Sequence, residues 1–189
     1  MFFTRDKPNI IILVNIQGHA GLFTVLCDAL NGKHYKQAID NESLYMSTRM
    51  AAGLIINNIL VLGGIDGISG IFLKEGVMEA LAVVLKDVRA EAVHLVSHKL
   101  VTEFVNHITN VVDKFEVIVE PLIFSLGRDK VISNNLFSLD AISRLLVYDR
   151  MLDLFIEEGL ISKLCNIIAK FVEDQENIPL VIQSITILT

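Results

Sequence analysis

The sequence lacks several features that mark whole classes of protein. It contains no tryptophan, only two cysteines and three prolines in 189 residues. Two cysteines are too few for a disulfide framework, which excludes small disulfide-stapled domains and favours a reducing compartment. We therefore expect a cytoplasmic protein, with the nucleus and the cytoskeleton as alternative locations. No Pro, Gly or Ser run marks a linker, so residues 1–189 are expected to form a single domain.

Positive charge is also scarce. The chain has 16 Lys and Arg residues against 22 Asp and Glu residues, which gives a net charge of −6 at pH 7. The basic residues form no stripe on any predicted helix, whereas nucleic-acid phosphates are bound by clustered positive charge. The sequence therefore argues against nucleic acid as a direct ligand.

Long uninterrupted apolar runs are missing as well, although 52% of the residues are hydrophobic. The most apolar window, 53–72, contains Asn57, Asn58, Asp66 and five glycines, which would place polar groups and weak helix formers in hydrocarbon. The apolar run 10–16 is too short to span a bilayer, and no small-residue cleavage site follows the first residues. We expect neither a membrane span nor a signal peptide.

The chain does contain one pattern of about eleven residues that recurs. Its clearest copies, and then a more diverged one, lie at residues 75–85, 116–126, 158–168 and 20–30. In each copy apolar residues recur at steps of three and four, as Val77, Leu81 and Val84 do, which predicts a short helix with one buried face. The recurrence indicates a repeat protein.

The two cysteines fall at the same place in this pattern. Cys27 and Cys165 are equivalent to Ala82 and Ile123 of the other copies. We therefore predict that both thiols are small core residues and not reactive groups.

Two more segments flank each copy. A shorter apolar-periodic segment precedes it, at 10–17, 66–74, 107–114 and 148–157, and a longer one follows it, at 42–62, 88–105, 132–147 and 176–189. The unit is therefore a short, a medium and a long helix in about 42 residues. The approximate repeats are 10–64, 65–105, 106–147 and 148–189. Such a unit cannot cover its own apolar faces, so the repeats are expected to stack on one another.

Two irregularities interrupt the regular spacing. Residues 32–41 form a polar insertion between the medium and the long helix of the first repeat, and it is interpreted either as a binding element or as a tolerated surface loop. The sequence also stops inside an amphipathic segment, 182–189, whose apolar face has no following repeat. We expect a fragment of a longer array, or an element that another chain completes.

The three-helix unit, the Glu-Gly start of the medium helix and the segment Arg49 to Asn58 together resemble the armadillo repeat, with HEAT repeats as the related alternative. The resemblance covers nearly the whole chain. It implies an all-α fold, a right-handed armadillo-like α-solenoid (superhelix) of about four three-helix repeats. It also implies that an extended peptide or another protein binds along a concave groove lined by the third helices.

Peptide-binding armadillo proteins carry a ladder of Trp and Asn residues on these third helices. By the resemblance, the Asn positions correspond to Asn57, Thr102, Ser143 and Ile185, and the Trp positions to Gly53, His98, Leu139 and Val181. Because the chain has no Trp, the aromatic walls that hold a lysine stem are absent and recognition of nuclear-import signals is not expected.

The remaining polar residues of the groove are the candidate binding site. They are Arg49, Asn57, His94, His98, Thr102, Asn135 and Ser143. For each of them an ordinary polar residue on a solvated helix face is the alternative interpretation. The sequence thus predicts a non-catalytic scaffold or adaptor that binds a protein or peptide partner. The alternative is a structural segment that self-associates through its apolar terminal faces, as a homodimer or a longer array.

Three clusters contain residue types that could bind a metal or phosphate or act as catalytic acids. Glu91, His94 and His98 share one helical face, and two His residues four positions apart can bind zinc. No Glu directly follows the first His, and the sequence indicates no third ligand, so no metal site is expected. The glycines of 63–70 lack the Gly-Lys-Ser/Thr sequence of a phosphate loop. The acidic residues of 149–158 are interpreted as a solvated face or a contact for a basic partner. We expect no enzyme and no cofactor.

Overall fold

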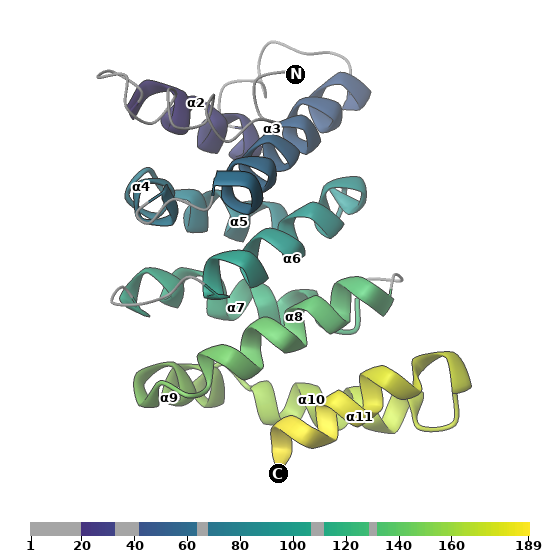
Figure 1. The fold of residues 1–189 in the computed structure, drawn as a ribbon. Helices are drawn as coiled ribbons and strands as arrows, with labels where there is room; N and C mark the ends of the chain where they lie inside the picture. Colours follow the sequence, from purple (N-terminus) through teal and green to yellow (C-terminus); the bar gives the residue numbers. More distant parts are fainter. Residues whose placement is uncertain (1–19, 33–41, 64–67, 107–111, 129–131) are drawn as a thin grey trace.

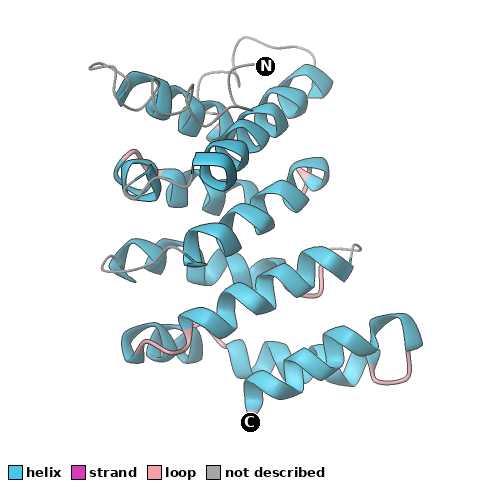
Figure 2. Ribbon diagram, in the orientation of Figure 1, coloured by secondary structure: helices cyan, strands magenta, loops and turns pink. Residues whose placement is uncertain are grey.

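The computed structural model describes residues 20–32, 42–63, 68–106, 112–128 and 132–189 (Figure 1). Every regular element in these ranges is helical (Figure 2), which confirms the predicted all-α class. Residues 10–17, most of the insertion 32–41 and His107 lie outside the described residues.

The helices occur close to the predicted segments. The medium segments form α2 (Ala20–Asn31), α5 (Val77–Lys86), α7 (Glu116–Ser125) and α10 (Leu160–Phe171). The long segments form α3 (Glu42–Gly63), α6 (Glu91–Asn106), α8 (Ile132–Leu145) and α11 (Ile178–Leu188), the last preceded by the 3₁₀ turn η2 (Gln175–Asn177). The short segments form α4 (Ile68–Lys74), the 3₁₀ turn η1 (Val112–Phe115) and α9 (Asp149–Glu157).

The Glu-Gly start of the medium helices has a conformational cause. Gly76 and Gly159 are the N-cap residues of α5 and α10, and their φ angles are 82° and 85°. This left-handed conformation is unfavourable for residues that carry a Cβ atom. Each glycine therefore lets the chain turn directly from a short helix into a medium one.

The helices pack on one another in chain order. The long helices form one consecutive series, in which α3 contacts α6, α6 contacts α8 and α8 contacts α11. The medium helices form a second series, in which α2 contacts α5 and α5 contacts α7, which in turn packs on α9. Figure 1 shows both series running through the molecule from its purple to its yellow end.

The core follows these two series. Phe23, Phe72 and Phe104 join α2, α4 and α6 through edge-to-face contacts, with ring centroids 4.7 and 6.1 Å apart. Leu81 of α5 is fully buried, as are the apolar residues of α7 that face α5 and α9. Burial of this kind, not helix propensity, provides most of the stability of short helices.

The prediction for the two cysteines is confirmed for Cys27 and wrong for Cys165. Cys27 is 3% exposed, whereas Cys165 is exposed at the surface of α10. Ala82 and Ile123, at the equivalent positions of α5 and α7, are buried by the helices that pack on them. The described residues place no such helix over Cys165. The same position in the pattern therefore has two different environments.

Burial also sets the chemistry of Cys27. It raises the pKa of the Cys27 thiol to about 12, and the negative charges of Glu75, Asp28 and Glu79 add to this shift. A thiol with such a pKa is not a nucleophile near neutral pH.

Helix α3 is the one candidate for a membrane span among the described residues. Its segment Ser43–Val61 is long and apolar enough by length and composition to cross a bilayer. In the structure 44% of the most apolar window of this segment is buried against other parts of the chain. Core helices of folded proteins pass the same test.

Candidate functional site

Each long helix has some residues that are exposed to solvent. Each of α3, α6 and α8 packs on its neighbours in the series and on a medium helix, which leaves one stripe of each long helix exposed. Besides Glu91 of α6 and Arg144 of α8, the exposed residues of the four long helices include Leu44, Ser47, Leu54, Asn58, Val61, Leu95, Lys99, Ser143, Ile182 and Ile185. We call this set the long-helix face.

The long-helix face is rich in large apolar side chains. Leu54 is 42% exposed, Leu95 is 49% exposed and Ile182 is 58% exposed. Single exposed apolar residues are common on protein surfaces, but several of them on two helices that pack together, as on α3 and α6, are typical of a surface that another protein covers. Lys99 is the charged member of the set.

The seven predicted site residues lie mostly beneath this face. Ser143 is exposed on α8, whereas the other six are at most 9% exposed: Arg49, Asn57, His94, His98, Thr102 and Asn135. The alternative interpretation as polar residues on a solvated helix face is therefore wrong for these six. Their hydrogen bonds connect neighbouring helices.

Arg49 joins three segments of the chain. Its Nε donates to the backbone oxygen of Leu30 at 2.9 Å, and its Nη1 lies 2.9 Å from Oδ2 of Asp87. The guanidinium carbon also lies 5.3 Å from the ring centroid of Tyr45. Arg49 is fully buried, so it links α2, α3 and the turn between α5 and α6 without reaching solvent.

Asp87 is the acidic partner of this ion pair. Burial acts to raise the pKa of the Asp87 carboxyl, but the hydrogen bonds from Arg49 and Arg89 outweigh it and hold the pKa below its usual value. The Asp87 side chain is 15% exposed. The carboxylate is therefore the form that the folded protein stabilises.

His98 and Thr102 connect α6 to α8. Nδ1 of His98 and the hydroxyl of Ser138 share a hydrogen bond of 2.6 Å. The hydroxyl of Thr102 donates to the backbone oxygens of His98 and Phe137, each at 3.2 Å. These contacts fix the spacing of two adjacent long helices.

The His94 and His98 side chains are engaged separately. Their ring centroids are 6.1 Å apart with an interplanar angle of 80°, and Nε2 of His94 lies 3.1 Å from the backbone oxygen of Asp87. Within the described ranges no group of three or more His, Cys, Asp or Glu residues is arranged to hold a metal ion.

The two asparagines differ in what they contact. Oδ1 of Asn135 accepts a hydrogen bond of 2.7 Å from the backbone N–H of Gly127, which ties α8 to the preceding turn. Oδ1 of Asn57 is buried and has no hydrogen-bond partner among the described residues. A buried acceptor without a partner destabilises a protein by about 1–3 kcal/mol.

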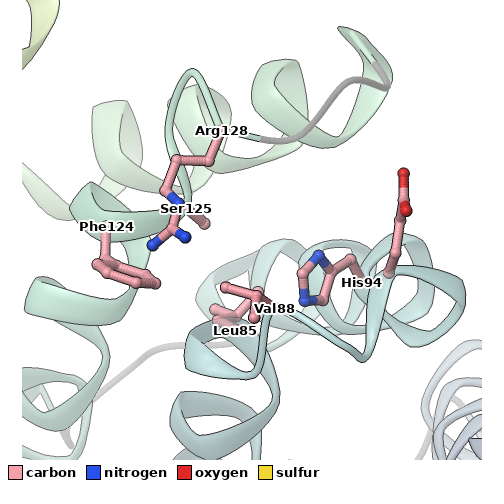
Figure 3. Close-up of a pocket in the computed structure, with 7 residues that line it drawn as sticks. Leu85, Val88, His94, Phe124, Ser125 and Arg128 are labelled. Carbon is pink, nitrogen blue, oxygen red and sulfur yellow. The ribbon is translucent and has the colours of Figure 1, made fainter.

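A cavity of about 260 Å³ lies between the α5–α6 turn and the α7–α8 turn. Figure 3 shows His94 on one side of it and Arg128 over Phe124 on the other, with Leu85 and Val88 between them. A volume of this size admits a side chain or a small ion, and is below the range typical of cofactor sites.

The sequence also contains a basic cluster that its charge pattern did not reveal. Arg128 lies in the α7–α8 turn, and Lys163 and Lys170 lie on α10. Lys163 and Lys170 are seven positions apart on one face of α10, and the packing of α10 against the turn brings Arg128, 35 positions before Lys163, close to Lys163.

Comparison of the chain with models of known families, with curated proteins and with solved structures found no match.

Proposed function

We propose that the chain is a non-catalytic protein-interaction scaffold, built as a right-handed armadillo-like α-solenoid of about four three-helix repeats. The partner, a protein or an extended peptide, binds along the groove formed by the third helices. The observation that supports this proposal is the long-helix face, in which α3, α6 and α11 carry exposed large apolar residues and α3 packs on α6.

The buried polar residues take a supporting role in this proposal. Arg49, His98 and Thr102 hold neighbouring helices at fixed spacing. A rigid surface loses little conformational entropy when a partner binds, so such a framework favours binding. The partner contacts the exposed residues of the long-helix face, which include Ser143 of the predicted site.

The experiment is a binding comparison of surface variants. Leu54→Glu with Leu95→Glu places two charges on the long-helix face, and Val83→Glu, at a residue 43% exposed on α5, is the matched control. We expect the double variant to lose capture of the partner from cell extract while the control keeps it. Circular dichroism checks that both remain folded. Equal capture by both proteins would remove the long-helix face as the binding surface.

A second candidate is self-association. Ile156 of α9 and Ile161 of α10 are about half exposed, and Cys165 is exposed on the same helix as Ile161. An apolar surface of this kind fits a second copy of the chain. Light scattering over a range of concentrations tests it: Ile161→Glu should abolish a dimer that Val88→Glu preserves, and a monomer at every concentration would refute it.

A further inference from the structure

The α7–α8 turn is held tightly against α10. Gly127 has a φ of 70°, and a Cβ atom at this position would lie 3.3 Å from Cγ1 of Ile167. Its N–H donates to Asn135, and the preceding Leu126 is fully buried. The turn is therefore fixed from both sides, which fixes where the backbone of Arg128 lies.

Beside this turn is a small cavity whose polar lining is cationic. It has a volume of about 140 Å³ and is lined by Leu126, Gly127, Lys163, Asn166, Ile167, Lys170 and Phe171. None of its lining residues, in the described part of the chain, is Asp or Glu. Asp129 and Lys130, next in sequence to Arg128, lie outside the described residues and carry opposite charges.

Two cations, Arg128 in the turn and Lys170 in the lining of the cavity, contact aromatic rings. The guanidinium of Arg128 lies 4.0 Å from the ring centroid of Phe124, and Nζ of Lys170 lies 4.6 Å from that of Phe171. A ring face attracts a cation without neutralising its charge.

The electrostatic environment of Lys163 also favours an anionic ligand. Burial lowers the pKa of its ammonium group, and the positive charges of Arg128 and Lys170 lower it further. A half-buried ammonium between two other cations is destabilised unless an anion offsets it. This arrangement occurs in a chain whose net charge is −6, so the overall composition does not explain it.

We propose that this cavity binds a phosphoryl group, with Lys163 and Lys170 of its lining as cationic contacts, the Asn166 carboxamide as a neutral donor and the nearby Arg128 adding positive potential. A phosphate monoester carries close to two negative charges near neutral pH and has three acceptor oxygens, which matches a cluster of several cations better than a carboxylate does. None of the lining residues of this cavity belongs to the long-helix face, so the site does not depend on the proposed partner surface.

The test uses the full chain and isothermal titration calorimetry at constant ionic strength, with inorganic phosphate, a phosphoserine peptide and a peptide carrying Glu in place of phosphoserine. We expect saturable binding of phosphate that Lys163→Gln and Lys170→Gln each weaken at least about tenfold, which corresponds to a difference of about 1.4 kcal/mol. Lys114→Gln, at an exposed lysine of η1, removes the same charge and should change little. Lys170 is exposed, so its variant keeps the test valid if Lys163→Gln does not fold.

The outcomes separate the sources of the phosphoryl group. Tighter binding of the phosphoserine peptide than of inorganic phosphate assigns the site to a phosphorylated partner chain, and the reverse assigns it to a small phosphorylated molecule. Three results would overturn the proposal: no saturable phosphate binding, binding that Lys163→Gln and Lys170→Gln leave unchanged, or binding of the Glu peptide that is as tight as that of inorganic phosphate.

A second readout follows the lysine itself. Because the pKa of Lys163 is lowered, its amine should react faster with acetic anhydride than the exposed lysines do, and bound phosphate should slow that reaction. Mass spectrometry of the labelled peptides measures both rates. A labelling rate at Lys163 that phosphate does not change would contradict binding at this cavity.

Discussion

Replacement of Arg49 by methionine should destabilise the fold more than any exposed charge substitution. Methionine keeps an apolar stem of similar length, so the change removes chiefly the guanidinium and its hydrogen bonds to Leu30 and Asp87. Removing one member of a buried ion pair costs about 3–5 kcal/mol, because the other charge is left without its partner. Asp87 keeps its contacts with Arg89 and is 15% exposed, which places the expected loss near the lower end, at about 3 kcal/mol.

The assay is urea denaturation followed by circular dichroism at pH 7. The matched control is Arg144→Met, which breaks an exposed pair with Asp140 on α8. Exposed pairs of this spacing contribute about 0.3–0.5 kcal/mol. A loss of less than about 1 kcal/mol for Arg49→Met would refute the view that this network holds the helices together.

The same pair predicts a dependence on pH. The pKa of Asp87 is held below its unfolded value of about 3.9, so the ionised carboxyl stabilises the fold above that value. This contribution is lost as the pH falls through the lower pKa of the folded state. The Arg49→Met variant lacks the arginine that lowers the pKa, so its stability should fall less between neutral and acid pH than that of the parent chain.

Four further substitutions and reactions test other parts of the structure. Leu81→Ala should cost about 2–5 kcal/mol in chemical denaturation, because Leu81 is fully buried in α5; a loss below 1 kcal/mol would contradict its burial. Gly159→Ala should cost about 1–2 kcal/mol through its backbone alone, since nothing lies within 4 Å of the added methyl group, and an unchanged midpoint would contradict the left-handed conformation. Asn57→Leu should be neutral or stabilising in the same assay, because it removes a buried acceptor without a partner; a loss above 1 kcal/mol would show that the carboxamide is satisfied. With a thiol reagent at neutral pH, Cys165 should react at once and Cys27 only on unfolding; rapid reaction of both would contradict the burial of Cys27.

The sequence predicted the helices well because each has its own local signal. The steps of three and four in Val77, Leu81 and Val84 place α5 within two residues of its observed start. Gly76 and Gly159 mark starts that a left-handed residue requires. Both signals lie within one helix and its cap, so neither depends on distant parts of the chain.

The environment of the polar residues could not be predicted in this way. Periodicity places Arg49 on a helix, but its partner Asp87 lies 38 positions away and enters only when α3 packs on the α5–α6 turn. His98 and Ser138 are 40 positions apart in the sequence, and they share a hydrogen bond only because α6 packs against α8. The position shared by Cys27 and Cys165 likewise gives no information about which of the two a further helix covers.

The basic cluster is the clearest example of a site that only the packing creates. Arg128, Lys163 and Lys170 belong to a turn and to the following medium helix, and no single helix carries them as a stripe. A scan of the sequence for runs of positive charge therefore passes over them, although burial and then the charges of Arg128 and Lys170 lower the pKa of Lys163.

The proposal that the long-helix face binds the partner is tested most directly by site-specific photo-crosslinking. A photoreactive residue is placed at Leu95, on the long-helix face, and in a second protein at Val83 of α5, and each is irradiated in cell extract. Both positions are similarly exposed, so access of solvent does not distinguish them. The proposal predicts a discrete crosslinked partner at position 95 and none at position 83. A partner that crosslinks at position 83 and not at position 95 would contradict it.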